Sequence, residues 1–313
     1  MKTGLLLLIT LLTIMAGKSL QAQTSSCAGF DYSTNNRLRS IPLGVWQLGL
    51  THEYRSVSRL VSGKIKRDDA SRARSSRNIL LELNRRLTNS LSITAMLTFV
   101  QKNHTIRMPV IGKNYLLTRG FGDGFFGLRY SLIPWNVDAG GDISFGLGLK
   151  APSGKSDLTL YGIEIAPDMQ PGTGSVDAVL WGGVTQRIHP KSPLSLSIDA
   201  MYRRNGTNSR EYKFGNEFLG YLGAMFFSRS NAHFTAGVKY LTIAEHKRFS
   251  EVIVPNTGGR WVYLVGTLDA NYSKKLRWEF SIRYPAYQKV NGTQLSTSYE
   301  YSITLLYALN LKP

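Results

Sequence analysis

The stretch SYEYSITLLYAL, residues 298–309, alternates between two kinds of side chain. The apolar set is Tyr299, Tyr301, Ile303, Leu305, Tyr307 and Leu309. The side chains between them are small, polar or charged, and Leu306 is the apolar exception. A period of two places the two sets on opposite faces of a β-strand. A run of about ten residues is long enough to cross a bilayer as a tilted strand.

The same alternation recurs about twelve times between Val45 and Leu309, which is the repeat expected of a membrane barrel. Short turns are expected at Thr88–Ser90, Pro134–Gly141, His189–Pro193, Ser228–Ala232 and Ser273–Lys275. Long connections are expected at Arg59–Arg77, Asn103–Gly122, Ala151–Gly174, Asn205–Gly215, Ala244–Gly259 and Ala286–Thr297. Short and long connections alternate, as they do when short turns lie on one side of a membrane and long loops on the other.

This pattern predicts an all-β fold, an antiparallel up-and-down transmembrane β-barrel of about twelve strands over residues 44–313. A secreted β-sandwich or lectin is the alternative, but sandwiches seldom keep such regular hairpin asymmetry. The mean hydropathy is −0.14, so no run after the N-terminus is expected to form a membrane helix. Abundant glycine (30 residues) and an excess of tyrosine over phenylalanine (16 against 13) suit a barrel with crowded small residues and interfacial rings.

The N-terminus has the features of a secretory signal peptide over residues 1–22. Lys2 supplies the positive start, residues 5–16 the apolar core, and the small residues up to Ala22 a cleavage site. Export to the cell outer membrane argues against a nucleic-acid partner in spite of a net charge of +18. The polar segment 23–43 is expected to be a periplasmic tail or a plug. It carries the one cysteine, Cys27, expected to be a free thiol, with a lipid anchor as the alternative.

The polar parity of the strands carries charges of both signs, which are expected to line the lumen. The acidic candidates are Glu53, Glu82, Asp199, Asp269 and Glu279. The basic candidates are Arg55, Arg86, Arg129, Lys150, Arg203, Arg277 and Arg283. Because charges in a narrow, low-dielectric space must pair, a salt-bridged interior is expected, with a dedicated ligand site as the alternative. Much of the remaining positive charge lies in loops, where it would attract lipopolysaccharide phosphates or an anionic solute.

Two chemical motifs are excluded by spacing. Residues 150–156 (KAPSGKS) resemble a phosphate-binding loop, but the interval from Gly148 to Gly154 is one residue too long for GxxxxGK[ST]. The five histidines show no HxxxH or HxxE pair, so no metal or other cofactor is expected. A Ser–His enzyme would need its pair at the outer rim, and His52 has no evident serine partner. No enzymatic activity is expected, and an outer-membrane lipid-active enzyme is the alternative.

Three segments resemble one family, the outer-membrane transporters grouped as "meta-pathway of phenol degradation" proteins. Residues 120–130 (GFGDGFFGLRY) are similar to the family's G-x-G-D strand start. Residues 149–157 (LKAPSGKSD) are similar to its lPtGk segment, and residues 170–184 to its G-x-G-s-x-D strand start. The resemblance implies a β-barrel that passes small hydrophobic or aromatic compounds. Many outer-membrane barrels end on an aromatic residue that serves as a signal for the barrel-assembly machinery. Residues 310–313 (NLKP) do not end on an aromatic residue and so depart from this pattern.

These segments are expected to form the mouth of the barrel. The expected mouth residues are Gly122, Asp123, Lys155, Gly172, Gly174 and Asp177. The glycines can take positive φ and let a loop fold tightly into the mouth. The two aspartates are expected to anchor extracellular loops to a basic residue at the rim, Lys150 or Lys155. Ordinary turn chemistry is the alternative.

The sequence thus predicts a channel for passive diffusion of a small, hydrophobic or aromatic solute. Its other expected partners are outer-membrane lipid, lipopolysaccharide and the barrel-assembly machinery. A closed structural or adhesion barrel with a basic extracellular surface is the alternative. An open lumen would favour transport, and a lumen closed by paired charges would favour the structural role.

Overall fold

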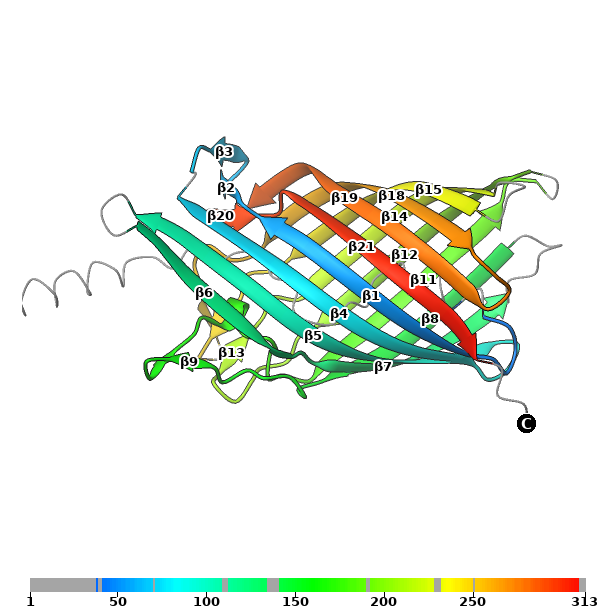
Figure 1. The fold of residues 1–313 in the computed structure, drawn as a ribbon, viewed down its shortest axis with the longest axis horizontal. Coiled ribbons are helices and arrows are strands. Elements are labelled where there is room, and N and C mark those ends of the chain that lie inside the picture. The colour runs from blue at the N-terminus through cyan, green and yellow to red at the C-terminus, as the bar shows by residue number, and fades with distance from the viewer. Residues whose placement is uncertain are drawn as a thin grey trace, which may run out of the picture.

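Long antiparallel strands close into a barrel (Figure 1). The computed structural model describes Leu38 and residues 41–69, 71–108, 112–133, 141–189, 192–227, 232–249 and 251–309. The twelve barrel strands are β1 (Trp46–Val57), β4 (Arg72–Arg86), β5 (Leu91–Met108), β7 (Gly124–Ile133), β8 (Gly141–Ala151), β11 (Asp177–Arg187), β12 (Leu194–Arg204), β14 (Glu217–Phe227), β15 (Ala232–Ile243), β18 (Gly259–Asn271), β19 (Leu276–Val290) and β21 (Tyr299–Leu309). Each strand pairs with the next one along the chain, and β21 pairs with β1 to close the ring. The predicted fold is confirmed.

The remaining elements extend the barrel at one end. They are β2 (Arg59–Ser62), β3 (Ile65–Arg67), β6 (Gly112–Phe121), β9 (Thr159–Leu160), β10 (Ile163–Glu164), β13 (Tyr212–Lys213), β16 (Lys247–Arg248), β17 (Val252–Ile253), β20 (Thr293–Ser296) and the 3₁₀ helix η1 (Pro167–Met169). In Figure 1 the labelled members of this set lie at the end opposite the C-terminus. We call this end extracellular, because long loops of bacterial barrels lie outside and short turns lie in the periplasm.

The barrel wall has an apolar outer face and a mixed inner face. On β21, Ile303 and Leu305 are 46% and 47% exposed, whereas Thr304 and Leu306, the residues that follow each of them, are both 1% exposed. The other barrel strands repeat this alternation. An apolar belt around the whole wall requires a lipid environment, which for a β-barrel is the outer membrane. Among the described residues, no helix is both long and apolar enough to span a membrane.

Barrel strands extend well into three predicted loops. In the loop predicted over Ala286–Thr297, β19 continues to Val290 and β20 follows. The other two lie at β4 and β5. β4 begins at Arg72, although the alternation predicts a strand only from Ile79. β5 continues to Met108 and pairs with β6, where a loop was predicted over Asn103–Gly122. The extensions of β4 and β5 lie beyond the apolar belt. Their inner face packs against a polar loop, and their outer face mixes cations with aromatic residues. The hydrogen-bonded ladder therefore continues without the apolar–polar alternation that the prediction requires.

Several predictions lie wholly or mostly outside the described residues. These are the signal peptide 1–22, Cys27, the turn at 134–140 and the end at 310–313. Segment 23–43 is described only at Leu38 and from Ile41 onward. Both of these side chains are buried, and Arg86 Nη1 donates to the Ile41 carbonyl oxygen at 3.5 Å. The two alternatives for this segment, a periplasmic tail and a plug, both stay predictions.

The wall is irregular between β6 and β8. β7 pairs with both β5 and β8, but β6 pairs only with β5. Instead of a strand, the segment that follows β8 contacts β6 and the start of β7. The Lys155 amide donates to the Phe121 carbonyl oxygen at 2.9 Å, and the Gly124 amide donates to Ser153 Oγ at 2.8 Å. This break in the wall places the end of β8 beside the predicted mouth residues.

Candidate functional site at the extracellular mouth

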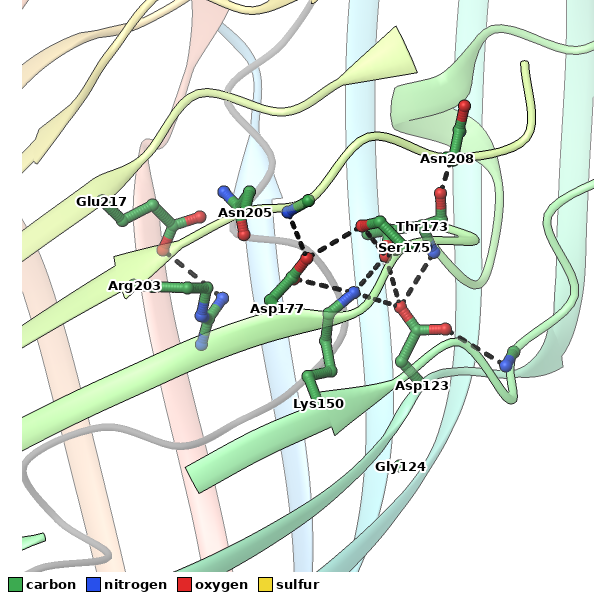
Figure 2. Close-up of polar contacts among 12 residues, drawn as sticks. Asp123, Gly124, Lys150, Thr173, Ser175, Asp177, Arg203, Asn205, Asn208 and Glu217 are labelled. Carbon is green, nitrogen blue, oxygen red and sulfur yellow. Dashed lines mark hydrogen bonds and ion pairs between the residues drawn. The ribbon is translucent and has the colours of Figure 1, made fainter. Parts of the chain in front are cut away.

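Lys150 joins two aspartates at the extracellular end of β8 (Figure 2). Its Nζ lies 2.6 Å from Asp123 Oδ2 and 2.8 Å from Asp177 Oδ2. Strand register causes this contact, because Lys150 lies opposite both Phe125 on β7 and Asp177 on β11. All three charged side chains are almost fully buried. A buried ion cluster is stable only when its remaining hydrogen-bonding groups are also satisfied.

Residues of the connection between β8 and β11, together with Gly206 after β12, supply those further bonds. The Thr173 amide donates to Asp123 Oδ2 at 2.9 Å, and its hydroxyl donates to the same atom at 2.6 Å. The Gly154 amide donates to Asp123 Oδ1 at 3.1 Å. Ser175 Oγ and the Gly206 amide donate to Asp177 Oδ1 at 2.8 and 3.0 Å. The cluster therefore fixes both ends of segment 152–176, which we call the mouth loop.

Lys155 does not take part in this anchor. The prediction offered Lys150 or Lys155 as the basic partner, and Lys155 instead lies 3.1 Å from Asp157, with both side chains more than half exposed. Lys150 points into the barrel because it shares the inward parity of β8. Lys155 lies beyond the strand, where no such parity constrains its side chain.

The glycines of the mouth act chiefly through close backbone approach, which corrects the prediction of positive φ. Of the predicted mouth glycines, only Gly174 has positive φ, at 71°. A Cβ on Gly172 would lie 2.6 Å from the Gly154 carbonyl carbon, and a Cβ on Gly154 would lie 2.6 Å from that of Gly122. Three backbone segments thus stack here with no room for side chains.

Beyond the anchor, the mouth loop packs against the inner face of β4, β5 and β6. Lys102 Nζ donates to the carbonyl oxygens of Asp168 and Gln170 at 2.9 and 2.8 Å. Thr118 Oγ1 donates to the Met169 carbonyl oxygen at 2.6 Å, and Arg74 pairs with the Asp168 carboxylate. Sequence reasoning missed these contacts, because Arg74 and Thr118 lie in segments predicted to be loops.

The opposite side of the mouth loop contacts the segments after β12 and β15. Asn208 Nδ2 donates to the Thr173 carbonyl oxygen at 3.0 Å, and Arg210 pairs with Glu164. A cavity of about 260 Å³ lies between these segments. Its lining includes Ile165, Pro167, Tyr212, Phe214, Val254 and Arg248. The mouth loop and these segments lie together at the extracellular end of the barrel, and we call them the roof.

A buried tyrosine and histidine form part of the roof. The Tyr212 hydroxyl lies 2.7 Å from His246 Nδ1. Burial raises the pKa of Tyr212 and lowers the pKa of His246 to about 4. Both groups are therefore neutral at pH 7, so the phenol donates to the imidazole nitrogen.

The predicted lumen charges lie on the inward parity of their strands. Arg55 Nε lies 2.9 Å from Glu300, and Arg283 lies 3.5 Å from Glu300 and 3.9 Å from Glu53. Other predicted charges form separate pairs: Arg129 with Asp142, Arg203 with Glu217 and Arg277 with Asp269. Glu82, Asp199 and Glu279 are buried, and Arg86 donates to backbone carbonyls near the periplasmic turn.

A second part of the inner wall is apolar, which sequence reasoning did not predict. Its buried side chains include Phe125, Val179, Trp181, Met201, Leu219, Tyr221, Leu241 and Trp261. Three of the aromatic side chains lie close against glycines of neighbouring strands: a Cβ on Gly146 would lie 2.2 Å from Trp181, one on Gly148 2.3 Å from Phe125, and one on Gly237 2.5 Å from Tyr221. Two features of the sequence could have indicated this apolar part of the inner wall. They are these glycines, and Trp181 on the otherwise polar face of its strand.

The fold and the apolar outer belt define this chain as an outer-membrane β-barrel. No family model matches the sequence, and no curated protein matches it. Among solved structures, the COG4313 outer membrane channel from Pseudomonas putida F1 matches with a TM-score of 0.66 and 12% identity, over 87% of this chain and 98% of that chain. The resemblance to phenol-degradation transporters predicted an outer-membrane barrel, and this match confirms that fold.

Two further solved structures are similar with lower scores. The CymD monoaromatic hydrocarbon channel has a TM-score of 0.45 and 14% identity, over 87% of this chain and 90% of that chain. The NanC porin has a TM-score of 0.48 and 10% identity, over 84% of this chain and 100% of that chain. At these identities the comparisons describe the fold alone.

Proposed function

We propose that the barrel carries a small apolar or aromatic solute across the outer membrane by passive diffusion. The apolar part of the inner wall supports this most directly. A barrel that only needed to hold its shape could fill the interior with paired charges, as it does around Arg55 and Glu300. Apolar side chains that face a lumen instead suit a solute that prefers an apolar surface to water.

The roof supports the same proposal at the entrance. Its cavity combines apolar and aromatic side chains with a few polar groups, a composition typical of small-molecule sites. A volume of about 260 Å³ suits a small aromatic molecule. The solute would enter through the roof and then move along the apolar wall.

Uptake of a hydrophobic fluorescent probe such as N-phenylnaphthylamine by intact cells tests this function. Leu219 and Leu222 lie on the same strand, β14, with Leu219 3% exposed on the inner face and Leu222 55% exposed on the outer face. We expect wild-type protein to accelerate uptake over cells without it. We expect Leu219→Trp to remove most of that gain and Leu222→Trp to leave it unchanged.

The closed structural barrel is the competing role, and the same assay separates the two. If wild-type protein gives no gain in uptake, or if Leu219→Trp and Leu222→Trp behave alike, the apolar wall carries no solute. The lipid-active enzyme has less support from the described contacts. His246 hydrogen-bonds Tyr212, and the His52 ring lies 6.2 Å from the Tyr301 ring.

A further inference from the structure

The outer face of the barrel carries charges of one sign only. Outward positions of the barrel strands and of β6 hold arginines and a lysine: Arg77, Arg85, Arg107, Arg119, Arg204, Arg260 and Lys289. No aspartate or glutamate occupies an outward position of the described barrel strands, because each of their acids shares the inward parity. All of these cations except Arg85 lie toward the extracellular end. The outer leaflet of the membrane therefore faces more positive charge on the barrel wall than the inner leaflet does.

Four cations gather where β18 and β19 reach the extracellular rim. Arg260 and Lys289 lie directly opposite each other on these strands. Arg59 lies 5.8 Å above the centre of the Tyr284 ring, and Lys64 Nζ lies 6.0 Å above that of Tyr287, the next outward aromatic residue on β19. We call Arg59, Lys64, Arg260 and Lys289 the outer cation patch.

The outer cation patch lacks an acidic partner among the described residues. Within the described part of the chain, none of its four cations forms an ion pair. Like charges directly opposite each other on paired strands are destabilising. The Arg260–Lys289 pair therefore favours a bound anion. The two tyrosines lie half exposed between the patch and the apolar belt, the level at which aromatic girdles meet lipid headgroups.

We propose that the outer cation patch binds the phosphates of a phosphorylated glycolipid of the outer leaflet, of the lipid A type. Arginine and lysine both bind phosphate, and arginine can do so with two parallel hydrogen bonds. The acyl chains of such a lipid would lie along the outward apolar side chains below, including Leu264 and Ile282. The proposal concerns the outer face and is independent of what the lumen conducts.

The test measures binding of bisphosphorylated lipid A to the full-length protein in detergent, by native mass spectrometry of the lipid-bound fraction. We expect Arg260→Gln with Lys289→Gln to weaken binding roughly tenfold to thirtyfold, from the contribution of two cations near an anionic surface. The matched control is Lys274→Gln with Lys275→Gln, which removes the same charge from the periplasmic turn between the same two strands. This control should bind as the wild type does.

Three further lipids make the result specific. Dephosphorylated lipid A with the same acyl chains should bind weakly and equally to all variants, and monophosphorylated lipid A should bind with intermediate affinity. Phosphatidylglycerol should bind less tightly than bisphosphorylated lipid A. Equal binding of phosphatidylglycerol, equal binding of dephosphorylated lipid A, or equal losses in both double variants would each overturn the proposal.

Folding of each variant is checked by the heat-modifiable mobility of the barrel on a gel. If Arg260→Gln with Lys289→Gln does not fold, Arg59→Gln with Lys64→Gln replaces it, because these two residues lie outside the barrel strands. That variant should also weaken binding of bisphosphorylated lipid A, and unchanged binding in it would contradict the proposal.

Discussion

The inner wall of the barrel carries a charged sector and an apolar sector, although the membrane belt of the outer face is apolar all round. The charged sector, on β1, β19 and β21, consists of Glu53, Arg55, Arg283 and Glu300. The apolar sector lies on strands from β7 to β18 and includes Phe125, Trp181, Met201, Leu219, Tyr221 and Trp261. The separate pairs Arg129–Asp142 and Arg203–Glu217 lie on the same group of strands. In the charged sector each ion faces an opposite ion, whereas in the apolar sector rings lie against glycines.

The charged sector and the apolar sector are suited to two different tasks. Paired charges fix strand positions at the cost of desolvating every ion, so they favour a single geometry over a passage. Rings that lie against glycines leave an apolar surface without projecting far from the wall. The Lys150 anchor belongs with the charged groups by chemistry, but it holds the mouth loop above the apolar sector. The predictions below test whether charges hold the shape and the apolar sector carries the solute.

The largest effect is expected when Lys150 is replaced by methionine. Asp123 and Asp177 would then remain buried without their cation, which we expect to cost about 3–5 kcal/mol. The measurement is the free energy of unfolding in urea, together with protease cleavage within the mouth loop. Lys155→Met removes an exposed lysine from the same segment and should change neither. Equal behaviour of the two variants would show that the anchor does not hold the loop.

A smaller effect is expected when Gly146 is replaced by alanine. The new Cβ would lie 2.2 Å from Trp181, so the ring must move off the wall into the lumen. We expect a loss of about 1–3 kcal/mol, typical of overpacking, and slower uptake of the hydrophobic probe. Gly266→Ala is the control, because its Cβ would meet only Ile282 at an ordinary 3.6 Å. Unchanged uptake in Gly146→Ala would show that the Trp181 ring does not lie along the solute path.

The roof over the apolar sector should loosen in acid. The pKa of His246 is about 4 in the fold, below its ordinary value of 6.5. The unfolded loop therefore binds a proton first, so the stability from neutral His246 is complete above pH 6.5 and is lost as the pH falls toward 4. At pH 5 the expected loss is about 1–2 kcal/mol.

Protease cleavage in residues 244–258, followed from pH 7 to pH 4.5, measures this loosening. Cleavage should rise as the pH falls in the wild type. His246→Phe keeps an aromatic ring but cannot be protonated, so its cleavage should not change with pH over the same range. A parallel rise in both proteins would assign the loosening to other groups.

The smallest effect is expected in the charged sector, when Arg283 is replaced by glutamine. Glu300 keeps its contact with Arg55 at 2.9 Å, so the network survives with one charge fewer. We expect stability to fall by about 1 kcal/mol, the net contribution of a typical hydrogen bond, because glutamine can still donate to the Glu300 carboxylate. Any current through a planar bilayer should become more cation-selective. No change in the reversal potential would mean that ions do not pass this sector.

Much of the fold followed from the sequence, and the reason is local. The period of two is a property of each strand alone, so β1 or β21 could be predicted without knowing its neighbours. The same parity placed Lys150, Asp177 and Arg283 on the inner face. Prediction failed where the local signal ends. β6 lies beyond the apolar belt, where Thr118 packs inward against the mouth loop and Arg119 faces outward, so apolar–polar alternation no longer marks the strand.

The site depended on information that no single segment contains. The sequence determined by itself which side chains point inward and that acids and glycines border the long connection after β8. Only the tertiary structure decided that Lys150, rather than Lys155, joins Asp123 and Asp177, because strand register and backbone stacking bring together residues up to 54 positions apart. It also decided that Trp181 covers Gly146 on a neighbouring strand, since such packing depends on which strands pair and in what register.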